Sequence, residues 1–371
     1  MSAMLHAEQL MAQALELAAE GLTLTSPNPR VGCVIASPDG QVLGRGHTQR
    51  AGGPHAEIMA LRDAQLRSNA VTGATAYVTL EPCSHQGRTG PCCDALALAG
   101  IKRVVASIAD PNPLVCGAGF SRLRAAGVEV EIGTGAEHSR ELNLGFFSRM
   151  VRKTPWVRMK IAASLDGQTA LENGSSQWIT SDTARADGHA WRARSCAVLT
   201  GIGTVLADNP RLDVRLPGAL RQPHLVVVDS RLETSTDALI FIASRAVWIY
   251  TVEQNDVKKR ALEARGATVI RLPGANSKVD LAAMLHDLAL REINELHVEA
   301  GQKLNGSLIR EGLVDEFVVY LAPKLLGVGQ GMAQFGPLTT LAQAVPLEFK
   351  STDRLGADLR IVARVSGRDQ F

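Results

Sequence analysis

Aromatic residues are scarce in this chain of 371 residues, in which phenylalanine, tryptophan and tyrosine together make up only 4%. Aliphatic residues compensate, because the hydrophobic total of 46% lies far above the content of disordered chains. At roughly 150 residues per domain, this length predicts two or three folded domains. Long apolar runs are missing: no stretch approaches the ~20 apolar residues of a membrane-spanning helix, so we expect none.

An excess of charge of either sign is also missing, since 39 lysines and arginines stand against 37 aspartates and glutamates. The formal net charge of +2 gives no support for a nucleic-acid partner, whose phosphates usually require a strongly basic surface. No lysine or arginine precedes Arg30, and Glu8, Glu16 and Glu20 interrupt the apolar residues before it. A secretory signal has a basic start and an unbroken apolar stretch. We therefore expect a cytoplasmic protein.

Cysteine is sparse and unevenly distributed. Six cysteines in a chain of this length do not form the dense pattern of a disulfide-stabilised protein. All but Cys196 lie in the first third of the chain, at Cys33, Cys83, Cys92, Cys93 and Cys116. This clustering indicates local chemistry in the N-terminal part of the chain.

Strand and helix patterns alternate along the whole chain. After an amphipathic helix at residues 4–20, VGCVIAS and QVLGRGHT flank the turn SPDG and predict a β-hairpin. In the second half, strands such as VLTGIGTV, LVVVDS and EFVVYLAP alternate with helices such as TARADGHAWRARS. The pattern pauses at RMVRKTP (149–155). The sequence therefore predicts two α/β domains, residues 1–150 and 151–371, the first built on a mixed sheet with helices on its faces.

The first domain contains a pattern that suits a catalytic metal. His55 opens a helix, and Cys83 and Cys92 enclose the segment that joins a strand to the next helix. One imidazole and two thiolates leave the fourth position of a tetrahedral zinc ion for water, whose pKa the metal lowers toward ~7. Glu57, two residues after His55, can take the proton of that water and pass it to a leaving group.

Other interpretations of these residues stay open. An H-x-E pair on a helix is more commonly a surface or capping pair, and two nearby cysteines are commonly buried thiols; their joint occurrence favours zinc. Adjacent cysteines do not easily face one metal, so we assign Cys93 to packing. His85 lies inside the same loop, where it is either a competing ligand or a contact to substrate or phosphate.

The motifs of this half resemble a known family. H-A-E followed by T-L-E-P-C-S-H-Q-G-R-T-G-P-C-C, with S-P-N-P-R-V-G-C-V upstream, closely resembles the deaminase half of the bifunctional riboflavin-biosynthesis deaminase/reductase family. Zinc nucleobase deaminases share H-x-E with a later P-C…C, although they commonly place two residues between the cysteines where this chain has the eight residues SHQGRTGP. The resemblance implies a cytidine-deaminase-like fold, zinc on His55, Cys83 and Cys92, and Glu57 as proton shuttle.

The same resemblance extends to the substrate. It implies that Asn28, in the S-P-N-P-R stretch, lines the pocket. Arg88 and Lys102 are basic groups that can meet a substrate phosphate, with a solvated surface position as the alternative for Lys102.

A complete nucleotide-binding fingerprint is absent from the second domain. GIGTVL (201–206) begins like G-x-G-x-x-G but ends on leucine, and no G-x-x-x-x-G-K-[ST] loop occurs. The strand that ends in EAG (299–301) leads into a helix, and glycines at such a turn let backbone N–H groups approach a pyrophosphate. Taken alone, this turn is also an ordinary strand-to-helix connection.

Four motifs of the second domain resemble the reductase half of the same family: MKIAASLDG, SSQWIT, GTVLADNPRL and HVEAG. That half is similar in fold to dihydrofolate reductase and uses NADPH, so the resemblance implies a dihydrofolate-reductase-like α/β sheet. It implies cofactor contacts at Ala162, Trp178, Thr204, Asp208, Ser230, Gly301, Gln302, Lys303, Leu304, Asn305, Gly306 and Ser307. It implies substrate contacts at Ser176, Arg192, Leu212, Arg215 and Glu299.

The residue types agree in part with these roles. Arg192 and Arg215 can bind a sugar phosphate bidentately, and Glu299 can accept hydrogen bonds from ribose hydroxyls or an amine. The alternative for each arginine is a surface ion pair, and the alternative for Trp178 is a core position.

The resemblance implies two active sites that act in sequence: zinc-dependent deamination of a phosphorylated diaminopyrimidine, then NADPH-dependent reduction of its ribosyl group to ribityl. Lys160 or a water is the candidate proton donor of the reduction, and Ser230 and Arg231 are candidate contacts to the extra phosphate of NADPH. We expect a small-molecule substrate and a homo-oligomer, dimer or tetramer. Three alternatives are a free-standing deaminase, a reductase with a structural zinc site and a non-catalytic zinc-stabilised binding protein. Each leaves one set of motifs unexplained.

Overall fold

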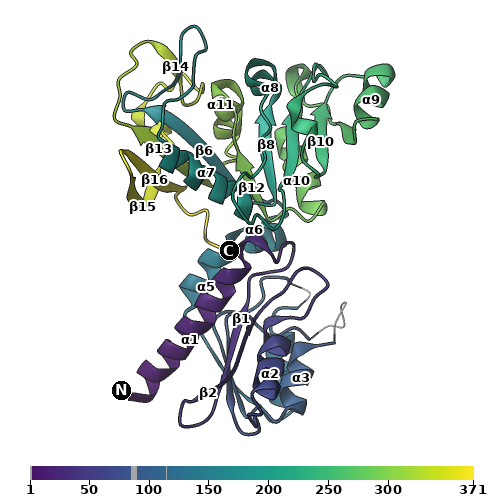
Figure 1. Ribbon diagram of the computed structural model, residues 1–371, viewed down its shortest axis with the longest axis vertical. Helices are drawn as coiled ribbons and strands as arrows, with labels where there is room; N and C mark the ends of the chain where they lie inside the picture. Colours follow the sequence, from purple (N-terminus) through teal and green to yellow (C-terminus); the bar gives the residue numbers. More distant parts are fainter. Residues whose placement is uncertain (1, 85–89, 114) are drawn as a thin grey trace. The chain divides into compact units, whose positions relative to one another are not determined.

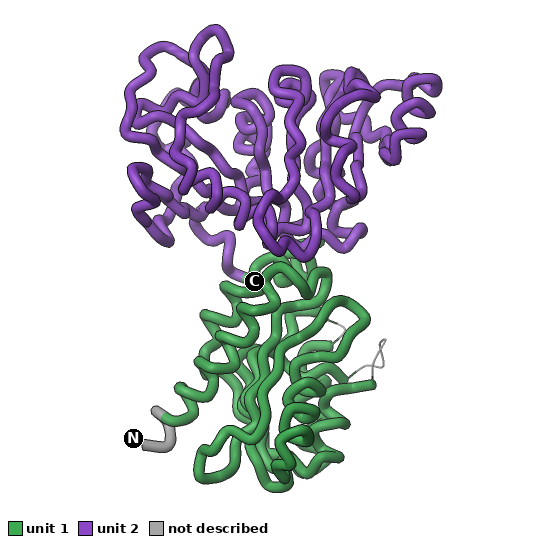
Figure 2. Tube along the Cα trace, viewed as in Figure 1, with its two compact units in different colours: residues 1–153, 371 green, residues 154–370 purple. Residues whose placement is uncertain are grey.

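A computed structural model of the chain describes residues 2–84, 90–113 and 115–371. The chain divides into two compact units, residues 1–153 together with Phe371 and residues 154–370 (Figure 2). Each unit combines a β-sheet with helices, so the predicted α/β class is confirmed (Figure 1). Among the described residues, no helix is both long enough and apolar enough to cross a membrane.

The first unit is built on a mixed sheet with the strand order β2-β1-β3-β4-β5. The predicted hairpin is present as the antiparallel pair β1 and β2, and β3, β4 and β5 run parallel to one another. The strands are β1 (Gly32–Ala36), β2 (Val42–His47), β3 (Thr75–Val78), β4 (Arg103–Ala106) and β5 (Glu129–Ile132).

Helices cover both faces of this sheet. The first helix packs on one face through Leu10, Met11 and Ala14, and four later helices contribute to the apolar core on the other face. Two helices near the end of the unit were not predicted from the sequence. The helices are α1 (Ser2–Glu20), η1 (Gly21–Thr23), α2 (Ala56–Leu66), α3 (Cys92–Leu98), α4 (Ala118–Ala125), α5 (Ala136–Leu142) and α6 (Leu144–Arg152).

The second unit is built on a larger sheet with the order β11-β10-β9-β8-β12-β6-β13-β16-β15. The strands from β11 to β13 in this order run parallel, and β16 and β15 complete the sheet as an antiparallel hairpin. A separate small sheet pairs β7 with β14. The strands are β6 (Trp156–Ser164), β7 (Gln168–Leu171), β8 (Ala197–Gly201), β9 (His224–Val228), β10 (Val247–Thr251), β11 (Ala267–Arg271), β12 (Glu295–Val298), β13 (Glu316–Ala322), β14 (Gly329–Gly331), β15 (Leu347–Leu355) and β16 (Asp358–Val365).

Capped helices cover the two faces of the large sheet. Ser181, Asn255 and Asp280 each accept a hydrogen bond from a backbone N–H of the first turn, which fixes the start of three helices. One face carries the apolar core under α10 and α11, and the other carries α7 and α9. The helices are α7 (Asp182–Arg194), α8 (Ile202–Asp208), η2 (Leu239–Phe241), α9 (Asp256–Glu263), η3 (Ala275–Ser277), α10 (Leu281–Leu290), α11 (Gln302–Arg310) and η4 (Leu341–Gln343).

Two local predictions need correction. The segment VLTGIGTV is not one strand, because β8 ends at Gly201 and α8 begins at Ile202. An apolar run of this length is compatible with a buried strand or a helix, and here it is divided between them. The strand β15 was missed because most of its residues are exposed, and because apolar and polar side chains alternate only over its first four residues, LEFK.

Candidate functional sites

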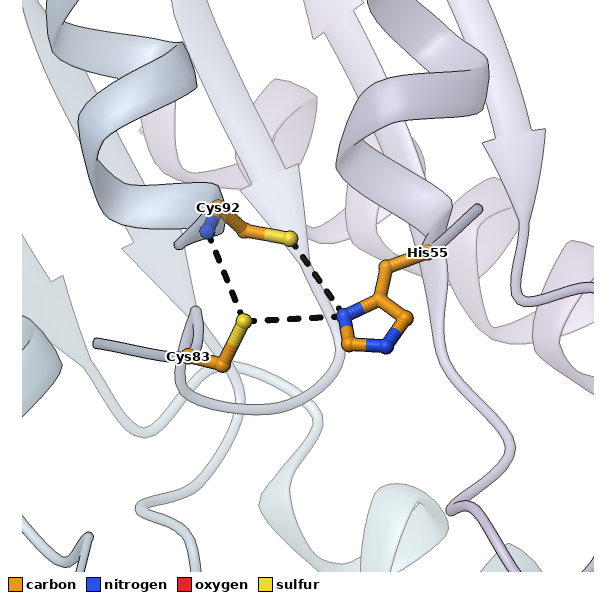
Figure 3. A group of neighbouring side chains, drawn as sticks. All are labelled: His55, Cys83 and Cys92. Atoms are coloured by element: carbon orange, nitrogen blue, oxygen red, sulfur yellow. Dashed lines mark hydrogen bonds between the residues drawn. The ribbon is translucent and has the colours of Figure 1, made fainter. Parts of the chain in front are cut away.

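Three side chains from two helix starts and one loop meet in the first unit (Figure 3). His55 is the residue that precedes α2, and Cys92 is the first residue of α3. Cys83 lies in the loop that follows β3, and its Sγ accepts a hydrogen bond from the backbone N–H of Cys92 at 3.4 Å. The sheet therefore brings together residues that are 28 and 37 positions apart in the sequence.

The spacing of these atoms fits a tetrahedral zinc ion. His55 Nδ1 lies 3.5 Å from Cys83 Sγ and 3.4 Å from Cys92 Sγ. Zn–S bonds of about 2.3 Å and Zn–N bonds of about 2.1 Å at tetrahedral angles place sulfur and nitrogen roughly 3.6 Å apart. All three ligand atoms lie within 4.8 Å of one another. The donor set and its spacing thus match the predicted site, with one coordination position left for a small ligand.

The two thiols affect each other's protonation. The contact with Cys92, and then the His55 ring, lower the pKa of Cys83 to about 4. The same contact and burial raise the pKa of Cys92. One thiolate therefore forms readily, and a bound cation favours loss of the second proton.

Glu57 is buried in the first turn of α2, two residues after His55. Burial, and then the negative charge of Cys83, raise the pKa of Glu57 to about 7. A carboxyl group with such a pKa can both accept and release a proton at neutral pH. The side chain is close enough to interact with Cys92, so it faces the ligand group.

The other predicted residues of this unit lie in different environments. Asn28 closes a turn through its backbone with Thr25, and no hydrogen bond links its side chain to the three ligands among the described residues. Lys102 is exposed beside β4, and Cys93 is buried in the hydrophobic core, as packing requires. His85 and Arg88 lie outside the described residues.

A cavity of about 1700 Å³ opens in the second unit. Its wall includes residues at or just after the carboxyl ends of β8, β9 and β12, together with the start of α11. In sheets of parallel strands, ligands bind in the crevice at these carboxyl ends. Gly301 precedes α11 and makes no side-chain cap, so the first N–H groups of this nine-residue helix are available to a pyrophosphate.

The cavity collects the predicted reductase residues. Its lining includes Ala162, Trp178, Thr204, Asp208, Ser230, Gly301, Gln302, Lys303, Leu304, Asn305 and Ser307. It also includes Ser176, Arg192, Leu212, Arg215 and Glu299. Gly306 does not line the cavity. It packs against residue 334 instead, since a Cβ atom at Gly306 would lie only 1.9 Å from the backbone oxygen of Gln334. The glycine is required there for close packing. The cavity's volume, helix start and polar lining suit a dinucleotide.

A largely buried ion pair between Arg192 and Glu299 lies in the lining of this cavity. Arg192 Nη2 donates to Glu299 Oε2 at 2.8 Å, Nε donates to Oε1, and Nη1 donates to the Asp213 carbonyl oxygen at 3.0 Å. Although burial opposes ionisation, Arg192 and Lys160 hold the pKa of Glu299 well below its usual range. The guanidinium is therefore committed to orienting Glu299, and the carboxylate stays ionised.

Arg215 and Trp178 are placed differently from Arg192. Arg215 donates to Asp213 at 2.8 Å, but its side chain is half-exposed, so part of the guanidinium is free to meet a ligand. Trp178 is 63% exposed and lies under the Arg185 guanidinium, 4.4 Å from the ring centre. The core alternative for Trp178 is thus excluded.

Some lining residues were missed by the sequence interpretation. Residues 274–276 and 278–281, in the stretch without recognisable motifs, border the same cavity. The residues Gly–Ala–Asn–Ser–Lys (274–278) form an ordinary loop pattern, so no local signal distinguished this segment. Tyr320 and Asp187 were also missed, because they meet only through a hydrogen bond between β13 and α7, which are far apart in the sequence.

Comparison with known proteins gives the same division into two halves. The zinc-binding region of cytidine and deoxycytidylate deaminases matches residues 4–108, and the RibD C-terminal domain matches residues 155–361. The riboflavin biosynthesis protein RibD of Escherichia coli is 44% identical over 365 residues, which cover 95% of this chain and 97% of the relative. The RibD protein of Aquifex aeolicus is 40% identical, covering 95% and 96% of the two chains.

Solved structures agree over nearly the whole chain. Acinetobacter baumannii RibD, form 1, superposes with a TM-score of 0.88 at 39% identity and covers 97% of this chain and 98% of its own. A Thermotoga maritima diaminohydroxyphosphoribosylaminopyrimidine deaminase/5-amino-6-(5-phosphoribosylamino)uracil reductase has a TM-score of 0.86 at 32% identity, with 97% and 99% covered. The chain therefore belongs to the RibD family of riboflavin biosynthesis, bifunctional enzymes that join a zinc-dependent deaminase to an NADPH-dependent reductase.

Proposed function

We propose that this chain deaminates 2,5-diamino-6-(5-phosphoribosylamino)pyrimidin-4(3H)-one and then reduces the ribosyl group of the product to ribityl. The observation that carries the proposal is the His55, Cys83 and Cys92 group with buried Glu57 beside it. The Thermotoga relative is named for both activities. We propose residues 1–150 as the deaminase domain and residues 151–371 as the reductase domain.

In the deaminase domain, His55, Cys83 and Cys92 would hold the zinc ion. The metal supplies a water of lowered pKa as the nucleophile at neutral pH. Glu57 would accept the proton of this water, transfer it to the ring nitrogen of the pyrimidine and assist the departure of ammonia. A carboxyl pKa of about 7 supports this shuttle because both protonation states are accessible. Asn28 is our candidate for orienting the pyrimidine.

In the reductase domain, NADPH supplies the hydride for the open-chain imine form of the substrate. The C=N bond becomes CH–NH when the hydride adds to carbon and a proton adds to nitrogen. Lys160 is our candidate proton donor, because it lines the cavity and burial lowers the pKa of its ammonium group. Arg192 would orient Glu299 toward the ribose, and Arg215 would meet the phosphate. Ser176 and Leu212 complete the proposed substrate contacts.

The cofactor contacts that we propose from the motifs are Ala162, Trp178, Thr204, Asp208, Ser230, residues 301–305 and Ser307. Gly306 has a packing role instead. Ser230 and Arg231 border the cavity and are our candidates for the 2′-phosphate of NADPH. Arg231 pairs with Glu233 at 3.1 Å on an exposed surface, so the pair can open to admit a phosphate.

Two properties of the whole protein are also proposed. We infer a homo-oligomer, dimer or tetramer, because Leu325, Val328, Leu341 and Phe349 of the second unit are large apolar side chains that are at least 74% exposed. We infer a cytoplasmic location, which agrees with six cysteines that form no disulfide.

The function is tested by reciprocal variants assayed for NADPH oxidation. On the diamino substrate, Glu57→Ala should lower the rate at least about a hundred-fold, because the proton shuttle is lost. The same variant should be normal on 5-amino-6-(5-phosphoribosylamino)uracil. Lys160→Met should release ammonia normally from the diamino substrate but oxidise little NADPH on either compound.

Removal of zinc by a chelator should reproduce the behaviour of Glu57→Ala, and added zinc should restore the rate. If Glu57→Ala oxidises NADPH as fast as the wild type on the diamino compound, deamination does not come first and the assignment of the zinc domain is wrong.

A further inference from the structure

Lys160 has few polar contacts inside the reductase cavity. It lies on β6, it lines the cavity wall, and among the described residues no hydrogen bond or ion pair engages its ammonium group. The nearest defined partner is the aromatic face of Tyr320 on β13, whose ring centre lies 5.8 Å from Lys160 Nζ. An ammonium ion within about 6 Å of an aromatic ring centre is attracted by the negative charge above the ring.

The Tyr320 side chain is fixed in place by burial and by a hydrogen bond. Its side chain is 1% exposed, and its hydroxyl donates to Asp187 Oδ2 on α7 at 2.6 Å. Arg360 Nη1 on β16 donates to both oxygens of Asp187, at 2.9 and 3.1 Å. Arg360 Nη2 also donates to Asp353 at 2.7 Å. The ring is therefore fixed by groups from a helix and the edge hairpin of the sheet.

The hydrogen bond to Asp187 affects the charge on the ring. Burial and Asp187 raise the pKa of Tyr320 far above its usual value, so the phenol keeps its proton and acts only as a donor. A phenol that donates to a carboxylate is polarised toward its ring, because hydrogen-bonded groups polarise one another in a medium of low dielectric constant. The ring face over which Lys160 lies becomes more negative as a result.

Among the described residues, the other charged groups near Lys160 form no hydrogen bond or ion pair with its ammonium group. Glu299 raises the pKa of Lys160, but Arg192 uses both oxygens of this carboxylate and itself lowers that pKa. His297 on β12 is fully buried, and burial lowers its pKa to about 3, so it contributes no charge at neutral pH. Burial is the largest effect and lowers the pKa of Lys160. Glu299 thus supports the charge of Lys160 from a distance, and the face of Tyr320 is the defined contact of the ammonium group among the described residues.

We propose that Tyr320, polarised by Asp187, is a positioning residue for Lys160. Its aromatic face holds the Lys160 ammonium group in place and keeps it charged, so that the ammonium group is free to donate a proton to the imine nitrogen. This inference rests on the proposed role of Lys160 in the reduction. The ring does not touch the reacting atoms, so its effect is on the protonation and orientation of Lys160. Because an aromatic face and not a carboxylate contacts the ammonium group, the N–H bonds of Lys160 stay available to the substrate.

The structure contains a matched control for this arrangement. On β10 of the same sheet, Tyr250 is fully buried and donates to Asp287, which pairs with Arg291. Among the described residues, no lysine lies over the ring of Tyr250. Tyr250→Phe removes a phenol hydroxyl from an equivalent group of tyrosine, aspartate and arginine, and it leaves the contact between Lys160 and Tyr320 unchanged.

The experiment measures kcat/KM for NADPH oxidation on 5-amino-6-(5-phosphoribosylamino)uracil between about pH 6 and about pH 10, a range that spans the titration of a lysine of lowered pKa. The variants are Tyr320→Leu, Tyr320→Phe, Asp187→Asn and the control Tyr250→Phe. Ammonia release from the diamino substrate and the melting temperature report folding in each protein.

The charged lysine is the active form, so activity should fall as pH rises through the pKa of Lys160. Tyr320→Leu removes the ring, and this alkaline fall should move to lower pH by about half a unit or more. Tyr320→Phe and Asp187→Asn should move it in the same direction by less, and Tyr250→Phe should leave it unchanged.

An alkaline limb that stays in place in folded Tyr320→Leu and Tyr320→Phe, or that moves equally in Tyr250→Phe, overturns the proposal. If Tyr320→Leu does not fold, Asp187→Asn decides, because its amide keeps an acceptor for the phenol while removing the charge. A wild type that oxidises no NADPH would instead refute the proposed function itself, and a fully active Lys160→Met would refute the proposed role of Lys160.

Discussion

Two glutamates with little solvent exposure have opposite protonation behaviour in the two halves of this protein. Burial, and then the negative charge of Cys83, raise the pKa of Glu57 to about 7. The Glu299 side chain is 12% exposed, and Arg192 and Lys160 hold its pKa well below the usual range although burial opposes this. Burial disfavours a charge unless an opposite charge compensates for it. The first carboxyl group is therefore suited to moving a proton, and the second to accepting hydrogen bonds as a permanent anion.

The paired N–H donors of the Arg192 guanidinium predict the effect of a single substitution on the reductase. Arg192→Lys keeps the positive charge but loses the paired donors to the two oxygens of Glu299. We expect kcat/KM of the reductase to fall about ten-fold or more, with deamination unchanged, in steady-state assays of both activities.

The neighbouring Arg194 is the control for this change. It lies on the same helix and pairs with Glu295 at 3.2 Å, outside the cavity lining. Arg194→Lys should leave the reductase close to the wild type, and equal losses in the two variants would contradict the role given to Arg192.

At the scale of elements, the loop that carries Cys83 is fastened to the start of α4. Glu81 Oε2 accepts hydrogen bonds from the backbone N–H groups of Asp110 and Gly117, at 3.1 and 2.9 Å. Its Oε1 accepts from Gly119 at 2.8 Å and from Phe120 at 3.4 Å. A single buried carboxylate thus satisfies the first donors of α4 and fixes the backbone two residues before Cys83, a proposed zinc ligand.

The close approach of these two elements predicts the effect of a small substitution. A Cβ atom at Gly119 would lie 2.1 Å from the backbone oxygen of Pro82, next to Cys83. Gly119→Ala should displace the loop, and we expect loss of most bound zinc and of deaminase activity while the reductase stays active. Zinc content measured by atomic absorption and the two assays check this expectation.

Gly90, in the same loop, is the matched control. Among the residues that the structure describes, a Cβ atom there would have no neighbour within 4 Å, so Gly90→Ala should retain zinc and activity. Full zinc occupancy in Gly119→Ala would show that the loop can move without disturbing Cys83.

At the scale of the whole molecule, the reductase sheet contains buried charges that join neighbouring strands. Arg158 on β6 donates to Glu295 on β12 at 2.8 Å and to Glu316 on β13 at 2.6 Å. Arg364 on β16 donates to Glu316 at 2.9 Å. The three side chains Arg158, Glu316 and Arg364 are at most 3% exposed, so each depends on its partners for compensation of its charge.

This network predicts how stability depends on pH. Burial acts to raise the pKa of Glu316, but Arg158 and Arg364 outweigh it and lower that pKa. A carboxylate with a lowered pKa stabilises the fold above its unfolded value of about 4.3, and this contribution is lost as pH falls through the folded value. Calorimetry should show the melting temperature of the reductase domain falling steeply below about pH 4.5.

Glu316→Gln tests the cause of that fall. The variant should be destabilised at neutral pH by about 3 kcal/mol, because two buried arginines lose a charged partner. Its melting temperature should depend less on pH in the acid range. A wild-type reductase transition that stays constant down to about pH 3 would exclude the network as the source of acid sensitivity.

The sequence predicted some parts of the structure well because the signals were local. The ligands His55, Cys83 and Cys92 stand at the starts of helices or after a strand, and these positions follow from apolar patterns and a proline. Predictions failed where burial did not follow the local pattern, as in β15, which is an edge strand with mostly exposed residues. They also failed where a short apolar run divides between a strand and a helix, as at Gly201.

The amino-acid sequence by itself determined the chemistry available to this protein: the residue types of the proposed metal site, the proposed shuttle residue Glu57 and the motifs of the RibD family. Only the tertiary structure decided the charge states of Glu57 and Glu299, the commitment of Arg192 to Glu299, and the support of Lys160 by Tyr320. Tyr320 and Asp187 are 133 positions apart and meet because α7 packs on the face of the sheet that carries β13. Charge states and such contacts depend on burial and on neighbours from other elements, and these exist only after the strands have taken their order in the sheet.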